Sequence, residues 1–470
     1  MARAAYACAM RTILPALSAL LLATTATAAV QPDKVATMRD AALKDDIAYD
    51  ITEGLTTEVG QRLAGTEAEA RARVWAARTL KSLGFANVRT ETFDMPVWVR
   101  GAETAEVTAP FAQKLVLTAL GNSGATPAAG IDAEVIGFAS LDELRAAPAA
   151  QVANKIVFVT HDMKANQDGS GYGYFGAVRR NGPSVASAKG AAAILIKSIG
   201  TDHHRVPHTG VQNWTDGVKP IPAAALSVPD AEQLSRILSR GQKVTIHLTL
   251  TPRDTGIHQS GNVIAEVPGR DPRAPIILIG GHLDSWDLGT GAIDDAAGLA
   301  ITTAAARRFL ATGAKPLRTI RLVWFGAEEV GGFGGEAYAK AHANEKHELV
   351  AEADFGGDRV WRMQATLAPA AKATSDQLME LLAPLGVTPG RGAAHGGTDV
   401  EPTANAQGTA IVDLGQDGTR YFDLHHTADD TFDKIEKPQM QQAVAAWTAM
   451  LGVVANTETP LAPGAAAKPQ

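Results

Sequence analysis

The second half of the chain alternates short apolar runs with helical patterns. Four runs rich in Val, Ile and Leu have the length of buried strands. They lie at residues 274–280, 318–325, 348–353 and 410–414, and an Ala-rich helix is predicted over residues 296–310. Strands that alternate with helices predict an α/β sheet, a mixed central sheet with helices on both faces.

The first half of the chain has a different pattern of apolar and polar residues. Residues 33–83 show a helical pattern that stops at Gly84, and a strand is predicted over residues 88–93. A Pro/Gly/Ala-rich segment at residues 121–130 then indicates a boundary. Short β-rich runs follow it, at residues 155–159, 191–196 and 244–250. We interpret this region as a β-rich lobe inserted into the α/β domain.

The N-terminus has the pattern of a secretory signal peptide. Arg3 and Arg11 precede an apolar run at residues 13–23, which the small residues 26–28 follow. The run is shorter than the roughly 20 residues of a membrane-spanning helix. The expected organisation is a signal peptide at 1–28, one domain formed by 29–125 and 255–457, an inserted lobe at 126–254 and a disordered tail at 458–470.

Composition narrows the classes of partner. The chain has 470 residues, 46% of them hydrophobic and 20% charged, which is typical of a globular protein. Its formal net charge is −7 and it has no long Lys/Arg block, which argues against binding to nucleic acid or to an anionic membrane. The only cysteine, Cys8, lies in the signal peptide. Any metal must therefore be held by His, Asp and Glu, the ligands of hydrolytic zinc.

Ionisable side chains follow each strand of the predicted sheet. They are His282 after the first strand, Asp294 at the start of the Ala-rich helix, Glu328 and Glu329 after the second strand, Asp354 at the end of the third, and His425 and His426 beyond the fourth. Open α/β sheets gather ligands in one crevice at the carboxyl ends of their strands. These distant residues are therefore expected to meet.

The inventory matches the needs of a two-metal centre. Two adjacent divalent ions need a bridging carboxylate, further ligands for each ion and a free carboxylate that takes a proton from the water. We predict that Asp294 bridges, that His282 and Asp354 complete one ion, and that Glu329 and His426 complete the other. Glu328 then remains as the general base. The carboxylate of Asp284 is expected to accept the second N–H of His282.

Several motifs resemble the co-catalytic zinc exopeptidase family of leucyl aminopeptidases and glutamate carboxypeptidases. They are the segments 282–286 (HLDSW), 294–298 (DDAAG), 327–332 (AEEVGG) and 426–431 (HTADDT), and further matches occur at 96–101, 207–210, 216–218 and 230–232. The segment 394–399 is one residue shorter than its counterpart in relatives. Such a family member has an eight-stranded mixed sheet and an inserted protease-associated-like lobe.

The resemblance also implies roles for site residues. Two zinc ions bind, the first acid of the pair, Glu328, is the base, Asp294 bridges, and His426 rather than His425 is a ligand. Tyr421 is placed to donate to the developing oxyanion. Close relatives suggest a homodimer. The implied substrates are dipeptides or short peptides with free termini.

Simpler interpretations apply to other motifs. Asp295 fits a helix cap, and the histidines 203, 204 and 208 fit a loop surface better than a metal site. Ser285 has no Gly-x-Ser-x-Gly elbow, which argues against a serine hydrolase. The sequence therefore predicts an exported zinc exopeptidase. The alternatives are an aminopeptidase on longer peptides, a single-zinc cyclase and a catalytically inactive binding module, and the last two are disfavoured because both sets of ligands are present.

Overall fold

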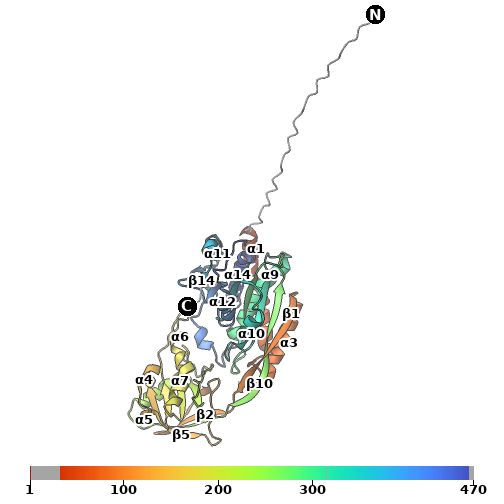
Figure 1. Ribbon diagram of the computed structural model, residues 1–470. Helices are drawn as coiled ribbons and strands as arrows, with labels where there is room; N and C mark the ends of the chain where they lie inside the picture. The colour runs from red at the N-terminus through yellow and green to blue at the C-terminus, as the bar shows by residue number, and fades with distance from the viewer. Residues whose placement is uncertain (2–31, 314, 465–470) are drawn as a thin grey trace.

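The computed structural model describes Met1, residues 32–313 and residues 315–464. Most of the predicted signal peptide and the last six residues of the predicted tail lie outside this range. Figure 1 shows a larger body with α9, α14 and β1 and a smaller one with α4, α5 and β5. The long strand β10 (Arg253–Val267) runs from one body to the other.

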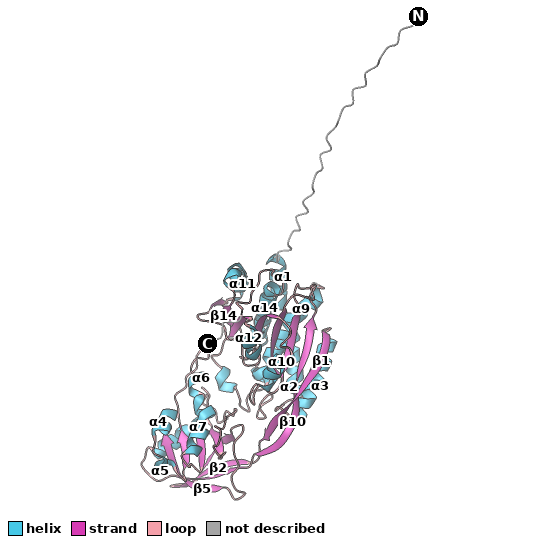
Figure 2. Ribbon diagram, in the orientation of Figure 1, coloured by secondary structure: helices cyan, strands magenta, loops and turns pink. Residues whose placement is uncertain are grey.

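The larger body is built on a mixed eight-stranded sheet, as predicted (Figure 2). Its order is β1 (Ala86–Val99), β10, β12 (Ile320–Phe325), β11 (Ile276–His282), β13 (His347–Glu352), β16 (Ala410–Gln416), β14 (Val360–Thr366) and β15 (Thr388–Pro389). The four predicted strands are its parallel centre, β12-β11-β13-β16. β12 and β13 are buried along their whole length, whereas alternate residues of β16 are only half-buried. The apolar residues in each strand are what made the strands visible in the sequence.

Helices cover both faces of this sheet. Alternate residues of β11 point to opposite sides, so Ile277 and Ile279 belong to one apolar cluster and Leu278 to another. The first face packs against α1 (Pro32–Ala42), α2 (Ile47–Glu58), α3 (Glu67–Ser82), α9 (Ala297–Thr312), α11 (Lys372–Leu382) and α14 (Lys437–Val454). The second face packs against α10 (Phe333–Ala341) and α12 (Glu401–Gln407).

The smaller body is the inserted lobe, and it has an eight-stranded sheet of its own. The order is β3 (Gln113–Leu115), β2 (Glu103–Ala109), β9 (Thr245–Leu250), β5 (Ile131–Phe138), β6 (Ile156–Val159), β7 (Ala193–Lys197), β8 (Ala223–Leu226) and β4 (Leu117–Ala119). Its helices are α4 (Leu141–Ala146), α5 (Ala149–Val152), α6 (Tyr172–Phe175), α7 (Ala177–Ala188) and α8 (Val228–Leu238). Because β2, β3 and β4 belong to it, the lobe's sheet begins upstream of residue 126, the expected boundary.

The start of the C-terminal tail differs from the expectation. Residues 458–464 were expected to be disordered together with the rest of 458–470, but Leu461 is completely buried. Its backbone N–H donates to the carboxylate of Glu348, and its carbonyl accepts from the N–H of Ala368 at 2.8 Å. The apolar side chain and these two backbone bonds hold a segment that its Ala/Pro composition had suggested was free.

The two bodies share side chains at their junction. Trp286, in the loop after β11, belongs to the apolar cluster of the lobe, and a Cβ added at Gly121 would lie 2.4 Å from its indole. Arg100 donates to the carboxylate of Asp287 at 2.8 Å and to the hydroxyl of Thr209 at 3.1 Å. The lobe is therefore packed directly against the loops that follow the central strands.

The central strands should tolerate truncation poorly. Ile279→Ala removes a fully buried side chain from β11 and is expected to lower the free energy of unfolding by about 2–5 kcal/mol, because it leaves a cavity. Val74→Ala, at a side chain with 71% exposure, is the control and should change it by less than about 0.5 kcal/mol. Denaturant unfolding measures both values, and a loss below about 1 kcal/mol for Ile279→Ala would contradict this account.

Candidate metal centre

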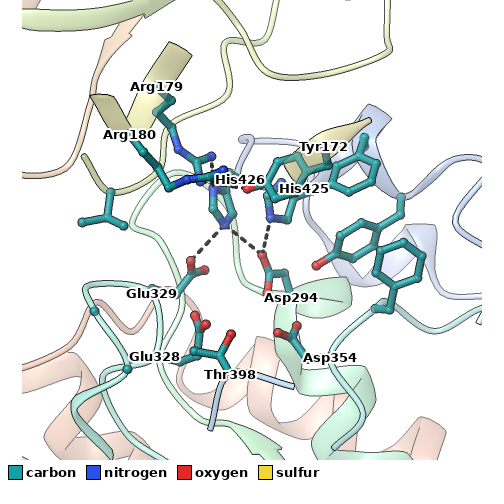
Figure 3. Close-up of a pocket in the computed structure, with 16 residues that line it drawn as sticks. Tyr172, Arg179, Arg180, Asp294, Glu328, Glu329, Asp354, Thr398, His425 and His426 are labelled. Carbon is teal, nitrogen blue, oxygen red and sulfur yellow. Dashed lines mark hydrogen bonds and ion pairs between the residues drawn. The ribbon is translucent and has the colours of Figure 1, made fainter. Parts of the chain in front are cut away.

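The predicted site residues meet in one pocket at the carboxyl edge of the parallel strands (Figure 3). The pocket has a volume of about 370 Å³. Its walls include Asp294, Glu328, Glu329, Asp354, Tyr421, His425 and His426. His282, the last residue of β11, lies directly behind Asp294. The spatial convergence expected from the sequence is thus present.

Asp294 lies between two histidines. Its Oδ1 is 3.0 Å from Nε2 of His282, and its Oδ2 is 3.3 Å from Nε2 of His426. Each oxygen of one carboxylate therefore faces a different imidazole. This is the arrangement that a carboxylate needs if it is to bridge two cations.

Each histidine also faces a second carboxylate. Nε2 of His282 is 3.6 Å from Oδ1 of Asp354, and Nε2 of His426 is 2.9 Å from Oε2 of Glu329. His425 stacks on His426 with 3.5 Å between the ring centroids, and its Nε2 is 3.6 Å from Asp294. Both histidines lie within ion-pair distance of Asp294, but of these two only His426 also pairs with Glu329.

The donor set fits divalent cations. Oδ2 of Asp294, Oε1 of Glu329 and Oδ1 of Asp354 are buried oxygens that accept no hydrogen bond within the described chain. Burying a charged oxygen without a partner costs several kcal/mol, so such atoms are expected to ligate metal. Imidazole nitrogen and carboxylate oxygen are the ligands of catalytic zinc. His282, Asp294 and Asp354 could hold one cation, and Asp294, Glu329 and His426 could hold a second one.

Backbone contacts fix the loop that carries Asp294. Oδ1 of Asp430 accepts from the N–H groups of Ala292 and Ile293, both at 2.7 Å. Asp295 precedes Ala296, the N-cap residue of α9, and accepts from the N–H of Gly298 in the first turn at 3.1 Å, a contact of the kind that a capping side chain makes. Its other oxygen accepts from the N–H of His282 at 3.1 Å. The loop and the end of β11 are thereby tied together.

Asp284 acts differently from the expectation. Nδ1 of His282 lies 3.0 Å from the backbone carbonyl of Asp284 and 3.7 Å from its carboxylate. The carboxylate accepts instead from the N–H groups of Glu328 at 3.0 Å and Glu329 at 3.3 Å. Asp284 therefore holds the turn that presents the two glutamates, and the imidazole is oriented by a main-chain carbonyl.

Arg62 is a supporting residue that the sequence did not reveal. It is fully buried, and its guanidinium donates to the carbonyls of Leu283, Thr290 at 2.6 Å and Gly291 at 2.9 Å. It therefore braces both ends of the loop between His282 and Asp294. The only sequence signal is its position in the Gly/Ala-containing segment 58–66 that interrupts the helical pattern.

Glu328 has the electrostatic environment of a base. Burial raises its pKa to about 8, and the carboxylates of Asp354 and Glu329 act in the same direction, while His282 opposes them. A cation beside Glu328 would lower this pKa again. A carboxylate that titrates near neutral pH can take a proton and return it.

Tyr421 lies on the same pocket wall. Its ring stacks on Phe355 at 4.6 Å and lies 5.0 Å from the ring of His425. Burial, together with the nearby carboxylates of Asp294 and Asp354, raises the pKa of Tyr421 well above its usual value. Its hydroxyl therefore stays protonated and is available as a hydrogen-bond donor.

The lobe supplies part of the pocket wall, which the sequence analysis missed. Tyr172 of α6 and Arg179 and Arg180 of α7 line the pocket opposite the carboxylates (Figure 3). Nη1 of Arg179 is 3.5 Å from Nδ1 of His426. The site is therefore built from both bodies.

The histidines of the lobe follow the surface interpretation only in part. His203 and His204 are exposed, as expected, whereas His208 is buried. Its two ring nitrogens lie 2.7 Å from the carboxylate of Asp202 and 2.7 Å from the carbonyl of His425. Because both ring nitrogens are occupied in this way, His208 connects the lobe to the histidine loop and is no metal ligand.

Comparison with known proteins gives the same family at each level. The sequence model of Peptidase family M28 matches residues 262–451. Carboxypeptidase Q of Mus musculus is 38% identical over 407 residues, 86% of this chain and 84% of that protein. Carboxypeptidase Q of Homo sapiens is 36% identical over 409 residues, with the same coverage of 86% and 84%.

Solved structures share the fold. The crystal structure of a peptidase M28 precursor from Shewanella amazonensis is 44% identical, with a TM-score of 0.89, and the match covers 93% of this chain and 99% of that one. A zinc aminopeptidase from Bacillus subtilis is 21% identical, with a TM-score of 0.64, and the match covers 88% of this chain and 95% of that one. At that identity the second match supports the fold alone.

The metal-free protein should lose stability as the pH rises. The pKa of Glu328 is raised from 4.5 to about 8 in the fold, so its contribution to stability is full below pH 4.5 and is lost as the pH rises through 8. Between pH 6.5 and 8 the contribution of Glu328 to the free energy of unfolding should fall by about 1–2 kcal/mol. Denaturant unfolding in chelator measures it.

Glu328→Gln is the matched variant, because it removes this titration and leaves Asp430 and the other buried acids. The metal-free variant should lose less stability over the same pH interval. An equal loss in both proteins would show that Glu328 is ionised throughout this range.

Proposed function

Because this chain belongs to peptidase family M28 and is a metallo-exopeptidase, we propose that it is exported and hydrolyses dipeptides or short peptides at a two-zinc centre with Glu328 as general base. One observation supports the two-zinc centre above all others. The two oxygens of Asp294 face His282 and His426 separately, and a further carboxylate stands beside each imidazole.

The roles of the side chains follow from this arrangement. His282, Asp294 and Asp354 would hold one zinc ion, and Asp294, Glu329 and His426 the other. When bound there, zinc supplies Lewis acidity that acidifies water and polarises the scissile carbonyl. Glu328 is the pocket carboxylate that this scheme leaves free of metal.

The reaction then needs two proton transfers. Glu328 takes a proton from the attacking water as the new C–O bond forms at the carbonyl carbon. Tyr421 keeps its proton and donates a hydrogen bond to the carbonyl oxygen that becomes negative. Glu328 returns the proton to the amide nitrogen as the C–N bond breaks, which releases the amine. No net proton is gained or lost by the protein.

Export is proposed from the N-terminal sequence pattern at residues 1–28. Over residues 32–313 and 315–464, none of the helices combines the length and apolarity of a transmembrane span. An aminopeptidase acting on longer peptides is the alternative specificity. It would need a path out of the pocket past the lobe residues Arg179, Arg180 and Val211, which line it.

Metal removal tests the zinc centre. Hydrolysis of a panel of free dipeptides should disappear after chelation and return with zinc, and metal analysis of the active protein should find two zinc ions per chain. Full activity after chelation, or with a single zinc ion per chain, would contradict the proposal. Blocking either terminus of longer peptides in the same panel separates the alternative specificity.

The base is tested by one substitution. Glu328→Gln should lower kcat by at least about 100-fold, within the range that general-base catalysis supplies, and should leave the zinc content unchanged. Glu380→Gln, at an exposed position of α11, is the matched control and should retain full activity. Near-normal turnover of Glu328→Gln would remove Glu328 from the mechanism.

A further inference from the structure

One loop of the lobe, residues 198–222 between β7 and β8, is docked on the segment that carries the two adjacent histidines. The short helix α13 (Tyr421–Leu424) leads to these histidines. The N–H of Thr201 donates to the carbonyl of Phe422 at 3.1 Å, and its hydroxyl donates to the carboxylate of Asp423 at 2.6 Å. The loop of one body therefore holds the helix of the other.

Thr209 of the same loop contacts His426 twice. Its N–H donates to the carbonyl of His426 at 3.0 Å, and its own carbonyl lies 3.2 Å from Nδ1 of His426. This carbonyl also accepts from Arg179 at 3.4 Å, and Arg179 donates in turn to the hydroxyl of Tyr172 at 2.8 Å. Because a carbonyl oxygen can only accept, Nδ1 of His426 carries a hydrogen. Its Nε2 is thus directed at the pocket carboxylates and is available to a metal (Figure 3).

His208, the residue before Thr209, holds the main chain of the histidine segment. It is 1% exposed, and its Nδ1 lies 2.7 Å from the carbonyl of His425. Its Nε2 lies 2.7 Å from Oδ1 of Asp202, which is buried as well. The carbonyl can only accept, so Nδ1 donates to it, while the carboxylate orients the other side of the ring. His208 therefore connects the lobe to the peptide unit that joins His425 to His426.

The lobe fixes the ring of His208 in this position. The N–H of His208 donates to the hydroxyl of Ser198 at 2.9 Å, and that hydroxyl donates to a carbonyl of β8 at 2.6 Å. The second oxygen of Asp202 accepts from the N–H of His204 at 2.7 Å. A Cβ on Gly200 would overlap the ring of His208, so the close approach of this backbone requires a glycine. The ring is therefore preorganised.

The peptide unit that His208 holds leads into an uncommon backbone conformation. The φ angle of His426 is +63°, in the left-handed region that residues other than glycine rarely adopt. Such a conformation persists only where the surrounding structure holds it. Here the side chain of His208 binds the carbonyl on one side of His426, and the N–H of Thr209 binds the carbonyl on the other.

The other histidine of the proposed centre is oriented differently. Nδ1 of His282 lies 3.0 Å from the carbonyl of Asp284, and the N–H of His282 donates to the carboxylate of Asp295 at 3.1 Å. All three residues belong to the larger body. One of the two histidines is thus positioned from within the central sheet and its loops, and the other is positioned by the lobe.

We propose that His208, oriented by Asp202, is a positioning residue that sets the zinc affinity of the site formed by Asp294, Glu329 and His426. This inference rests on the proposed two-zinc centre and makes its two sites unequal, because the lobe completes only one of them. Loss of a residue that orients a metal ligand typically weakens metal binding by about 10-fold to 100-fold. A change at His208 should therefore affect one zinc ion and spare the other.

The test is a zinc titration of the metal-free protein against a competing chromophoric chelator, which measures both affinities. His208→Leu removes both ring nitrogens, so it should raise the Kd of one zinc ion by about 10-fold to 100-fold and leave the other unchanged. His208→Asn, whose amide nitrogen takes the place of Nδ1, should retain most of the affinity. His203→Leu, at an exposed position of the same loop, is the matched control and should bind both ions as the wild type does.

Activity supplies a second readout that a merely structural role would not produce. At a buffered zinc concentration that just fills both sites of the wild type, His208→Leu should hydrolyse a dipeptide slowly. Excess zinc should restore its kcat and leave KM unchanged, because the reacting groups are still present. A residue needed only for folding would weaken both zinc ions together, and excess zinc would not restore kcat.

Asp202→Ala keeps the ring of His208 and removes the carboxylate that orients it, so it tests the inference if His208→Leu does not fold. It should weaken the same single zinc ion by a smaller factor. Unchanged zinc binding in both variants, or equal weakening of the two ions, would overturn the role of His208. A wild type that binds fewer than two zinc ions would instead refute the proposed two-zinc centre itself.

Discussion

One buried carboxylate organises this molecule. Asp294 is 4% exposed and lies between His282 and His426, which belong to segments 144 residues apart in the sequence. The pKa of Asp294 lies well below its usual range despite its burial, because the hydrogen bond from His282 and the ion pair with His426 favour the ionised form. The fold can keep this charge only if both imidazoles stay in place.

Much of the surrounding structure serves that requirement. Asp430 and Arg62 fix the backbone around Asp294, Asp295 joins the first helical turn of α9 to the end of β11, and Asp284 fixes the two glutamates. These contacts are mostly between a charged side chain and the main chain. They fix the positions of the proposed metal ligands, several of which lie in loops, as a preorganised site requires.

The sequence revealed the residues that chemistry selects by type. Strands β11, β12, β13 and β16 were visible because each contains a run of apolar residues, as strands of a sheet covered by helices do. The acids and histidines that follow these runs were found from their positions. β2, β3 and β4 were not assigned to the lobe, since short edge pairings depend on partners far along the chain, here β9 and β8. Arg62 and Arg179 were invisible for a related reason: their partners are backbone carbonyls, a tyrosine hydroxyl and an imidazole, which no local pattern encodes.

The same limit explains the error at Asp284, where spacing predicted an acid near His282 but not which of its oxygen atoms faces the ring. Trp286 adds a consequence for any attempt to separate the two bodies. Its indole belongs to the lobe's apolar cluster, yet its backbone lies in the loop between the strand of His282 and the turn of Asp294. Neither body is a detachable module, because removal of the lobe would expose this tryptophan to water beside the loop that carries Asp294.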